Sequence, residues 1–148
     1  MNIHEALKVA LANTFVMYFQ AHSYHWNVEG AGFPQYHSFF GSLYDELFGA
    51  IDPIAEHIRA LGEYAPISIM DVLEVGTVAE DDEKPSSIKE MLANLAEANE
   101  RVIESLNIAF EAAESEKNQG IMNFLADRLD IHAKHGWQLK SSLKALGK

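Results

Sequence analysis

The sequence predicts an all-α protein, built as a four-helix bundle with a long crossover between its second and third helices. Apolar residues recur at steps of three, four or seven in four long segments, the pattern of amphipathic helices packed in a bundle. Glycine, proline and asparagine separate these segments. Val, Ile and Thr are not concentrated in alternating runs, so no sheet is expected. The chain of 148 residues has about the size of one domain, and we expect a single domain over 1–148.

The first two helices are expected over residues 3–29 and 34–61. Gly30 separates them, and Pro34 suits the first turn of a new helix because its missing N–H has no helical partner there. Gly62 is typical of a residue that follows a helix end. The stripe of the first helix consists of Leu7, Leu11, Phe15, Tyr18 and His22.

The last two helices are expected over residues 87–116 and 119–146. Ser87 followed by Glu90 is a capping box that opens the third helix. The residues 118–120 separate the two helices, because asparagine and glycine there favour a break. Their stripes consist of Ile88, Leu92, Leu95, Val102, Leu106, Phe110 and Ala113, and of Ile121, Phe124, Leu125, Leu129, Leu139, Leu143 and Leu146.

The connection between the second and third helices, residues 63–86, is too long for a tight hairpin. It contains prolines, a glycine and the acidic run 80–83. Its roughly 24 residues are enough to run the length of the bundle, and 67–75 are a candidate short helix. A four-helix bundle with one long crossover has the ferritin-like topology.

The composition is strongly acidic, with 11 Lys and Arg against 22 Asp and Glu and a net charge of −11. This charge argues against nucleic acid as an unaided partner and for cations. The absence of cysteine excludes disulfides, zinc–thiolate sites, iron–sulfur clusters and a cysteine nucleophile. The uncharged run 9–28 contains too many polar residues for a membrane span. Without an export signal, a cysteine-free chain is expected to be cytoplasmic.

Seven histidines and 22 carboxylates raise the question of a metal site. The di-iron site of ordinary ferritin-like bundles needs Glu-x-x-His on two helices, because residues three apart share one helix face. No Glu or Asp in this sequence is followed by His three residues later. We therefore expect no di-iron site of this kind inside the bundle.

A second constellation runs along one face of the second helix. His37 and Asp52 are 15 residues apart, about 22 Å at the standard helical rise. Metal–ligand bonds are only about 2 Å long, so one chain cannot bring both to the same ion. Two antiparallel copies of the helix can, and a two-fold axis would form the site twice. An imidazole with the carboxylates of Asp52 and Glu56 suits iron, manganese or zinc, and His25 lies near the end of the preceding helix.

The axis would pass near residue 45, where Gly41 and Gly49 of the two copies would face each other and permit close helix packing. A simpler interpretation remains open. His25 is then a core or capping histidine, and Asp52 and Glu56 belong to a solvated helix face.

Three stretches resemble the Dps miniferritins, the DNA-protection-during-starvation proteins. They are YHWNVEGAGFPQYHSFF, DPIAEHIRALG and LADRLDIHAKHGWQLKSSL, and the resemblance extends from about Ala12 to Leu143. It implies a hollow shell of twelve subunits, built from two-fold dimers, that oxidises Fe(II) preferentially with hydrogen peroxide and stores ferric mineral. It also implies a ferroxidase centre with His25 and His37 from one subunit and Asp52 and Glu56 from its mate.

Two positions depart from the family. Gly41 stands where a carboxylate ligand is common, four residues after His37, so the site has one carboxylate fewer. Asp45, one turn further on, is a candidate replacement acting through water. His57 replaces the usual arginine after Glu56, and we expect it to be a neighbouring or surface residue rather than a ligand.

The main hypothesis is therefore an iron-oxidising, iron-storing shell that acts under oxidative stress, with zinc or manganese as substitute metals. The alternatives are a DNA-binding protective shell, and a metal-binding shell with weak or no oxidation because of Gly41. DNA binding is not expected, since lysines at both ends are sparse and the chain is acidic. Asp127 and Asp130 are candidate pore residues, with a solvated helix face as the alternative. Two roles are considered for Trp26, namely packing and the quenching of stray oxidants.

Overall fold

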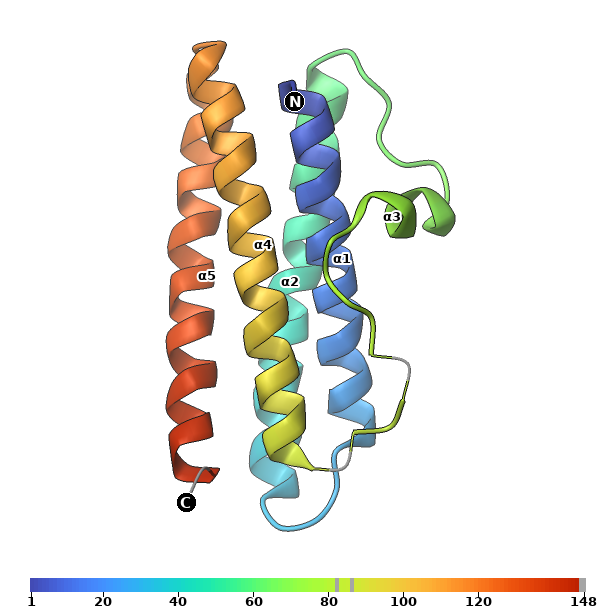
Figure 1. Ribbon diagram of the computed structural model, residues 1–148, viewed down its shortest axis with the longest axis vertical. Helices are drawn as coiled ribbons and strands as arrows, with labels where there is room; N and C mark the ends of the chain where they lie inside the picture. Colours follow the sequence, from blue (N-terminus) through green and yellow to red (C-terminus); the bar gives the residue numbers. More distant parts are fainter. Residues whose placement is uncertain (82, 86, 147–148) are drawn as a thin grey trace.

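The computed structural model describes residues 1–81, 83–85 and 87–146, and these form helices and connections without any strand. The described residues contain four long helices and a short one, whose arrangement is drawn in Figure 1. The predicted all-α fold is thus confirmed, and so is the short helix in the crossover. The helices are α1 (Ile3–Asn27), α2 (Phe33–Ala60), α3 (Ile69–Val75), α4 (Ile88–Ser115) and α5 (Gln119–Leu146).

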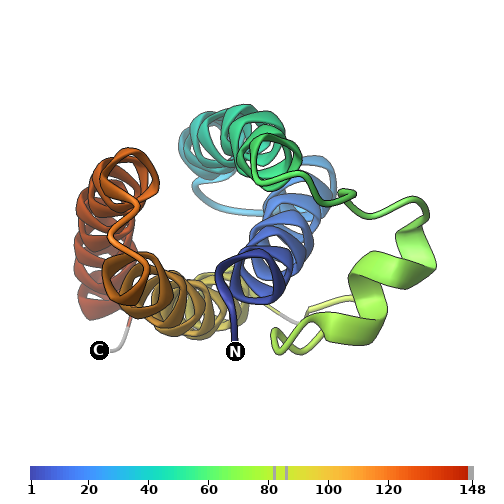
Figure 2. The same cartoon turned by 90° about the horizontal axis from the view of Figure 1, so that it is seen from above.

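The four long helices form two antiparallel pairs, α1 with α2 and α4 with α5, joined by packing of α1 on α4. The crossover leaves the end of α2, passes along the outside of α1 and reaches the opposite end of the bundle, where α4 begins (Figure 1). Seen from above, α3 lies outside the bundle beside α1 (Figure 2). Among the described residues, no helix has the length and apolar character needed to cross a bilayer.

Local capping interactions determine where the helices begin. Asn2 and Glu5 form a reciprocal capping box at α1, a signal that the sequence analysis did not use. Gly32 precedes α2 with φ +84°, a conformation in which a Cβ would be strained. At α4, the Ser87 side chain accepts a hydrogen bond from the Glu90 amide at 3.1 Å, as predicted.

The core lies between the four long helices and contains members of the three predicted apolar stripes, together with residues such as Met17 and those of α2, for which no stripe was predicted. Its fully buried side chains include Leu7, Met17, Phe40, Leu47, Ile54, Leu92, Leu106, Leu125 and Leu139. Burial of a side chain of this size contributes about 1.5–3 kcal/mol each, so the core holds the helices, and with them the site residues, in fixed positions.

Asn13, fully buried on α1, attaches the crossover to the bundle. Its Oδ1 accepts hydrogen bonds from the backbone amides of Thr77 at 2.6 Å and Val78 at 3.2 Å. Its Nδ2 donates to the Thr77 hydroxyl at 2.8 Å. Polar backbone groups near the core need such partners, so one side chain determines the path of the loop beyond α3.

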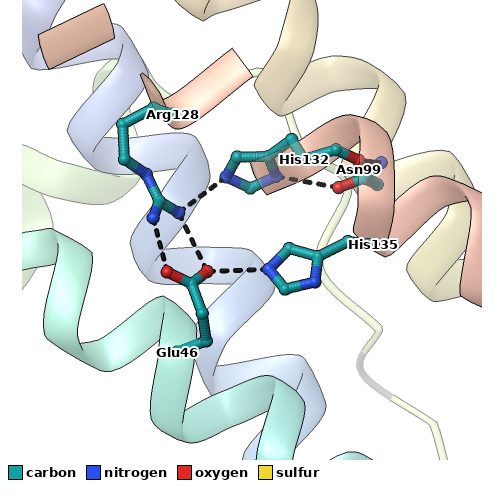
Figure 3. A network of polar contacts seen from close by, with 5 residues as sticks. All are labelled: Glu46, Asn99, Arg128, His132 and His135. Carbon is teal, nitrogen blue, oxygen red and sulfur yellow. Dashed lines mark hydrogen bonds and ion pairs between the residues drawn. The ribbon is translucent and has the colours of Figure 1, made fainter. Parts of the chain in front are cut away.

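A polar network joins α2, α4 and α5 inside the bundle (Figure 3). The Arg128 guanidinium donates to both oxygens of Glu46, at 2.5 and 3.1 Å. His135 Nε2 lies 2.7 Å from Glu46, and His132 lies 3.0 Å from Arg128 and 2.8 Å from Asn99. The network links α2 to α5 across the bundle.

The network shifts two pKa values in the folded protein. Burial alone would raise the pKa of the Glu46 carboxyl, but hydrogen bonds from His135 and Arg128, and their charges, lower it to about 2. Burial, together with the charge of Arg128, lowers the pKa of His132 to about 3. Both groups therefore take up protons more readily in the unfolded chain.

The free energy of unfolding is expected to decline as pH falls below about 6.5, because only the unfolded chain then protonates His132. Below about 4.5 the decline should steepen, since Glu46 likewise gains its proton only on unfolding. Urea unfolding at a series of pH values measures this. His132→Gln should flatten the decline between pH 6.5 and 4.5, whereas His4→Gln, a control outside the network, should leave it unchanged; equal profiles for both variants would contradict the account.

Candidate metal centre

The short connection between α1 and α2 brings His25 and His37 face to face. Their rings are stacked, with centroids 3.8 Å apart and planes 17° apart. His37 Nδ1 donates to the backbone oxygen of His25 at 2.7 Å, and His25 Nδ1 donates to the backbone oxygen of His37 at the same distance. The oxygen of His25 belongs to the last turn of α1, where carbonyls lack helical partners, so the pair also caps that helix.

These two hydrogen bonds determine which ring nitrogen is available to a ligand. A carbonyl oxygen only accepts, so Nδ1 carries the hydrogen on both rings. In the neutral imidazole, Nε2 then keeps its lone pair, which is the form that binds metals. The capping interpretation of His25 and the metal interpretation are thus compatible, because capping uses Nδ1 and leaves Nε2 free.

Gly41 lies directly against this pair. A Cβ at position 41 would lie 3.1 Å from Cε1 and Nδ1 of His25, closer than side chains normally approach. The glycine therefore has a reason within the chain, namely room for the His25 ring. Close packing against a second copy, the reason that the sequence analysis gave, is not needed to explain it.

Asp52 and Glu56 form an exposed carboxylate pair one turn apart on α2. The pKa of the Glu56 carboxyl is raised because its protonated form donates a hydrogen bond to Asp52, and because the negative charge of Asp52 disfavours its ionisation. Two carboxylates this close together attract a cation, which relieves the repulsion between their charges.

The structure does not bring the carboxylate pair to the histidine pair within one chain. α2 runs without interruption from Phe33 to Ala60, so His37 and Asp52 stay about four helical turns apart. No group of three or more His, Asp or Glu in the described part of the chain has the geometry to hold a metal ion. A complete site therefore needs ligands from outside the chain.

The face that carries these residues is apolar and exposed. Trp26 is 57% and Phe48 is 60% exposed, and Phe19 packs edge-on against Trp26 with ring centroids 6.2 Å apart. No atom lies within 4 Å of a Cβ built at Gly49 on the same helix, so nothing within the described chain requires glycine there. Exposed apolar surface next to an incomplete site is typical of a subunit interface.

The two uncertain positions of the sequence analysis lie on different sides of α2. Asp45 is exposed, between the histidine pair and the carboxylate pair in sequence. The His57 ring packs against Phe124 of α5, with centroids 4.5 Å apart. His57 therefore contacts the neighbouring helix. This position is compatible with the expectation that His57 is not a metal ligand.

Sequence reasoning placed His22 only in an apolar stripe, but it lies beside the histidine pair. Its ring stacks on Tyr44 at 3.8 Å, its Nδ1 lies 2.9 Å from the Tyr18 hydroxyl, and its centroid is 6.1 Å from that of His25. Burial, and then the charge of His25, lower the pKa of His22. The three-residue spacing between His22 and His25 was the signal that indicated a shared helix face.

Comparisons with known proteins agree with this architecture. Residues 4–148 match a family model described as a ferritin-like domain. A DNA protection during starvation protein of Halobacterium salinarum is 32% identical over 125 residues, covering 84% of this chain and 69% of that protein. The chain belongs to the Dps miniferritin family. Antigen TpF1 of Treponema pallidum is a further relative, 31% identical over 97% of this chain and 81% of its own.

Solved Dps structures share the fold of this Dps chain. The crystal structure of Dps from Staphylococcus aureus matches with a TM-score of 0.89 and 28% identity, covering 95% of this chain and 94% of that one. That of antigen TpF1 matches with a TM-score of 0.91 and 30% identity, covering 96% and 91%. A Vibrio cholerae Dps with a TM-score of 0.90 and 25% identity, covering 95% and 88%, is described as one of the ferritin-like diiron-carboxylate proteins.

Phe48→Glu is expected to prevent assembly of this Dps chain, because a charge would be buried in the apolar contact between copies. Sedimentation velocity should show a shift towards monomer mass. Ile108→Glu, a matched change of an exposed apolar residue on α4, should leave the assembly intact. Retention of the wild-type assembly by the Phe48 variant would mean that this face is not an interface.

Proposed function

We propose that this protein is a ferroxidase that oxidises Fe(II) with hydrogen peroxide and stores the ferric product inside a hollow shell of twelve subunits. Membership of the Dps family supports iron storage in a shell. The observation that carries the ferroxidase proposal is the histidine pair, whose hydrogen-bonded Nδ1 atoms leave two Nε2 atoms free beside an exposed apolar face.

An antiparallel arrangement of α2 with its two-fold copy supplies the missing ligands. The axis passes near residue 45, so the His25–His37 end of one subunit meets the Asp52–Glu56 end of the other. The contact is isologous and produces two equivalent sites. The proposed catalytic ligands are therefore His25 and His37 from one subunit and Asp52 and Glu56 from its mate, with Asp45 as a further candidate through water.

This donor set suits the reaction. Neutral imidazoles hold Fe(II) without adding negative charge, and the carboxylates stabilise the higher charge of Fe(III). Two Fe(II) ions give one electron each to one peroxide molecule, which with two protons becomes two water molecules. The paired transfer avoids release of hydroxyl radical. Zinc or manganese would fit the same ligands as redox-inert or slower substitutes.

His25→Ala and Asp52→Ala are each expected to slow peroxide-driven oxidation about 10- to 100-fold, because each variant removes a ligand. Stopped-flow absorbance after mixing anaerobic Fe(II)-loaded protein with peroxide measures the rate. The variants should assemble like the wild type, which sedimentation checks. Wild-type rates in both would remove these residues from the site.

Substitutions at Gly41 test whether the protein is a ferroxidase or a shell that binds metal without rapid oxidation. Gly41→Asp is expected to raise both the Fe(II) bound per site and the oxidation rate, because it adds a carboxylate at the cost of a small shift of the His25 ring. Gly41→Ala is the matched control, since it brings the same Cβ without the oxygen atoms. Anaerobic Fe(II) titration compares the three proteins, and equal behaviour of the Asp and Ala variants would show that the missing carboxylate does not limit the site.

A further inference from the structure

The polar network inside the bundle has the composition of a metal site, with an arginine where the ion would be. Arg128 Nη2 lies 3.1 Å from Glu46 Oε1 and 3.0 Å from His132 Nε2. The same Glu46 oxygen is 2.7 Å from His135 Nε2. The guanidinium thus contacts the carboxylate of Glu46 and the imidazole of His132, and the imidazole of His135 contacts the same carboxylate, as Figure 3 shows.

His132 is oriented as a ligand would be. Asn99 Nδ2 donates to the backbone oxygen of His132 at 3.0 Å, which leaves Asn99 Oδ1 to accept from His132 Nδ1 at 2.8 Å. Nε2 therefore carries the lone pair, and it faces the cation of Arg128. A second hydrogen bond that fixes the ring in this way is typical of histidines that bind metals.

Two imidazoles and a carboxylate form a donor set for iron, cobalt or zinc. The present distances of about 3 Å are those of N–H donors, whereas metal bonds measure about 2.0–2.2 Å, so the ligands would need to close in by about 1 Å. With the guanidinium in place they stay apart, which agrees with the absence of metal-binding geometry in the described chain.

Arg128 excludes a metal ion in two ways. Its guanidinium lies between Glu46 and His132, within hydrogen-bond distance of both, and its permanent charge repels a divalent cation at close range. The residue is only 5% exposed, and its Nε has no hydrogen-bond partner among the described residues. Leaving a buried donor unpaired costs stability.

We propose that the Arg128 guanidinium occupies a latent divalent-metal site formed by Glu46, His132 and His135, and thereby confines iron to the contact between subunits. The first part stands on the network alone. The second part rests on the proposed ferroxidase function.

The test uses Co²⁺ as a spectroscopic probe of the full-length protein, with Asp52→Ala as the parent to weaken the proposed interface site. Adding Arg128→Ala should increase the bound Co²⁺ by about one ion per chain, with visible absorption bands of a histidine-ligated ion. Adding Glu46→Gln to that variant should abolish the gain. Arg128→Lys, which keeps the positive charge, should bind no more than the parent.

Arg128→Gln provides a second neutral variant, closer in length to arginine, in case the alanine variant does not fold. Co²⁺ should raise the melting temperature of the neutral variants and not that of the lysine variant. The proposal is overturned if folded Arg128→Ala and Arg128→Gln proteins bind no more Co²⁺ than the parent. It is also overturned if anomalous scattering locates Co²⁺ among Glu46, His132 and His135 with Arg128 present.

A different measurement, the rate of iron oxidation, shows whether the ferroxidase proposal fails. Its failure would appear as unchanged iron oxidation in the Asp52→Ala parent, whatever the substitution at Arg128. A gain of Co²⁺ in the neutral variants would still support the latent site in that case.

Discussion

A single rigid helix of 28 residues carries both halves of the proposed iron site and keeps them apart. Metal ligands must lie within about 2 Å of the ion, whereas the histidine end and the carboxylate end of α2 are about ten times further from each other. Bending the helix to join them would break its backbone hydrogen bonds. The proposed chemistry therefore depends on symmetry, because only in the proposed two-fold dimer would the opposite end of α2 reach each histidine pair.

The reciprocal hydrogen bonds between His25 and His37 give the site a structural function and a chemical one. Each Nδ1 donates to a backbone carbonyl of the other residue, and these bonds fix the orientation of both rings. Each Nε2 stays free because of the same bond. Under the proposed function, such a pre-ordered ligand pair would lose little conformational entropy on binding iron.

Inside the bundle, carboxylate and imidazole groups are paired with an arginine instead of being left available to a metal ion. Glu46, His132 and His135 have the chemistry of metal ligands, but Arg128 hydrogen-bonds to Glu46 and His132, and His135 hydrogen-bonds to Glu46. If iron is oxidised between subunits, as proposed, such groups inside each subunit are better neutralised. Iron bound there would be separated from a second iron ion and would react with peroxide one electron at a time.

Much of the fold could be predicted from the sequence, because helix periodicity and caps are local signals. The four helices, the short helix near residues 69–75 and the Ser87 cap were predicted in this way. What the sequence could not supply were contacts between distant residues. The search for Glu-x-x-His missed the Glu46 network, because its groups come from three helices. Gly41 was correctly singled out, but the ring of His25 that it accommodates became visible only in the fold.

The proposed site residues remain a prediction, since one chain holds only half of each site. Co-assembly of two inactive variants tests the shared site most directly. A shell reassembled from equal amounts of His25→Ala and Asp52→Ala chains contains mixed dimers, in which one of the two sites is intact and the other has both defects. Random pairing makes half of the dimers mixed, so about a quarter of the wild-type oxidation capacity should return. No recovery in shells shown to be mixed would contradict a site built from two subunits.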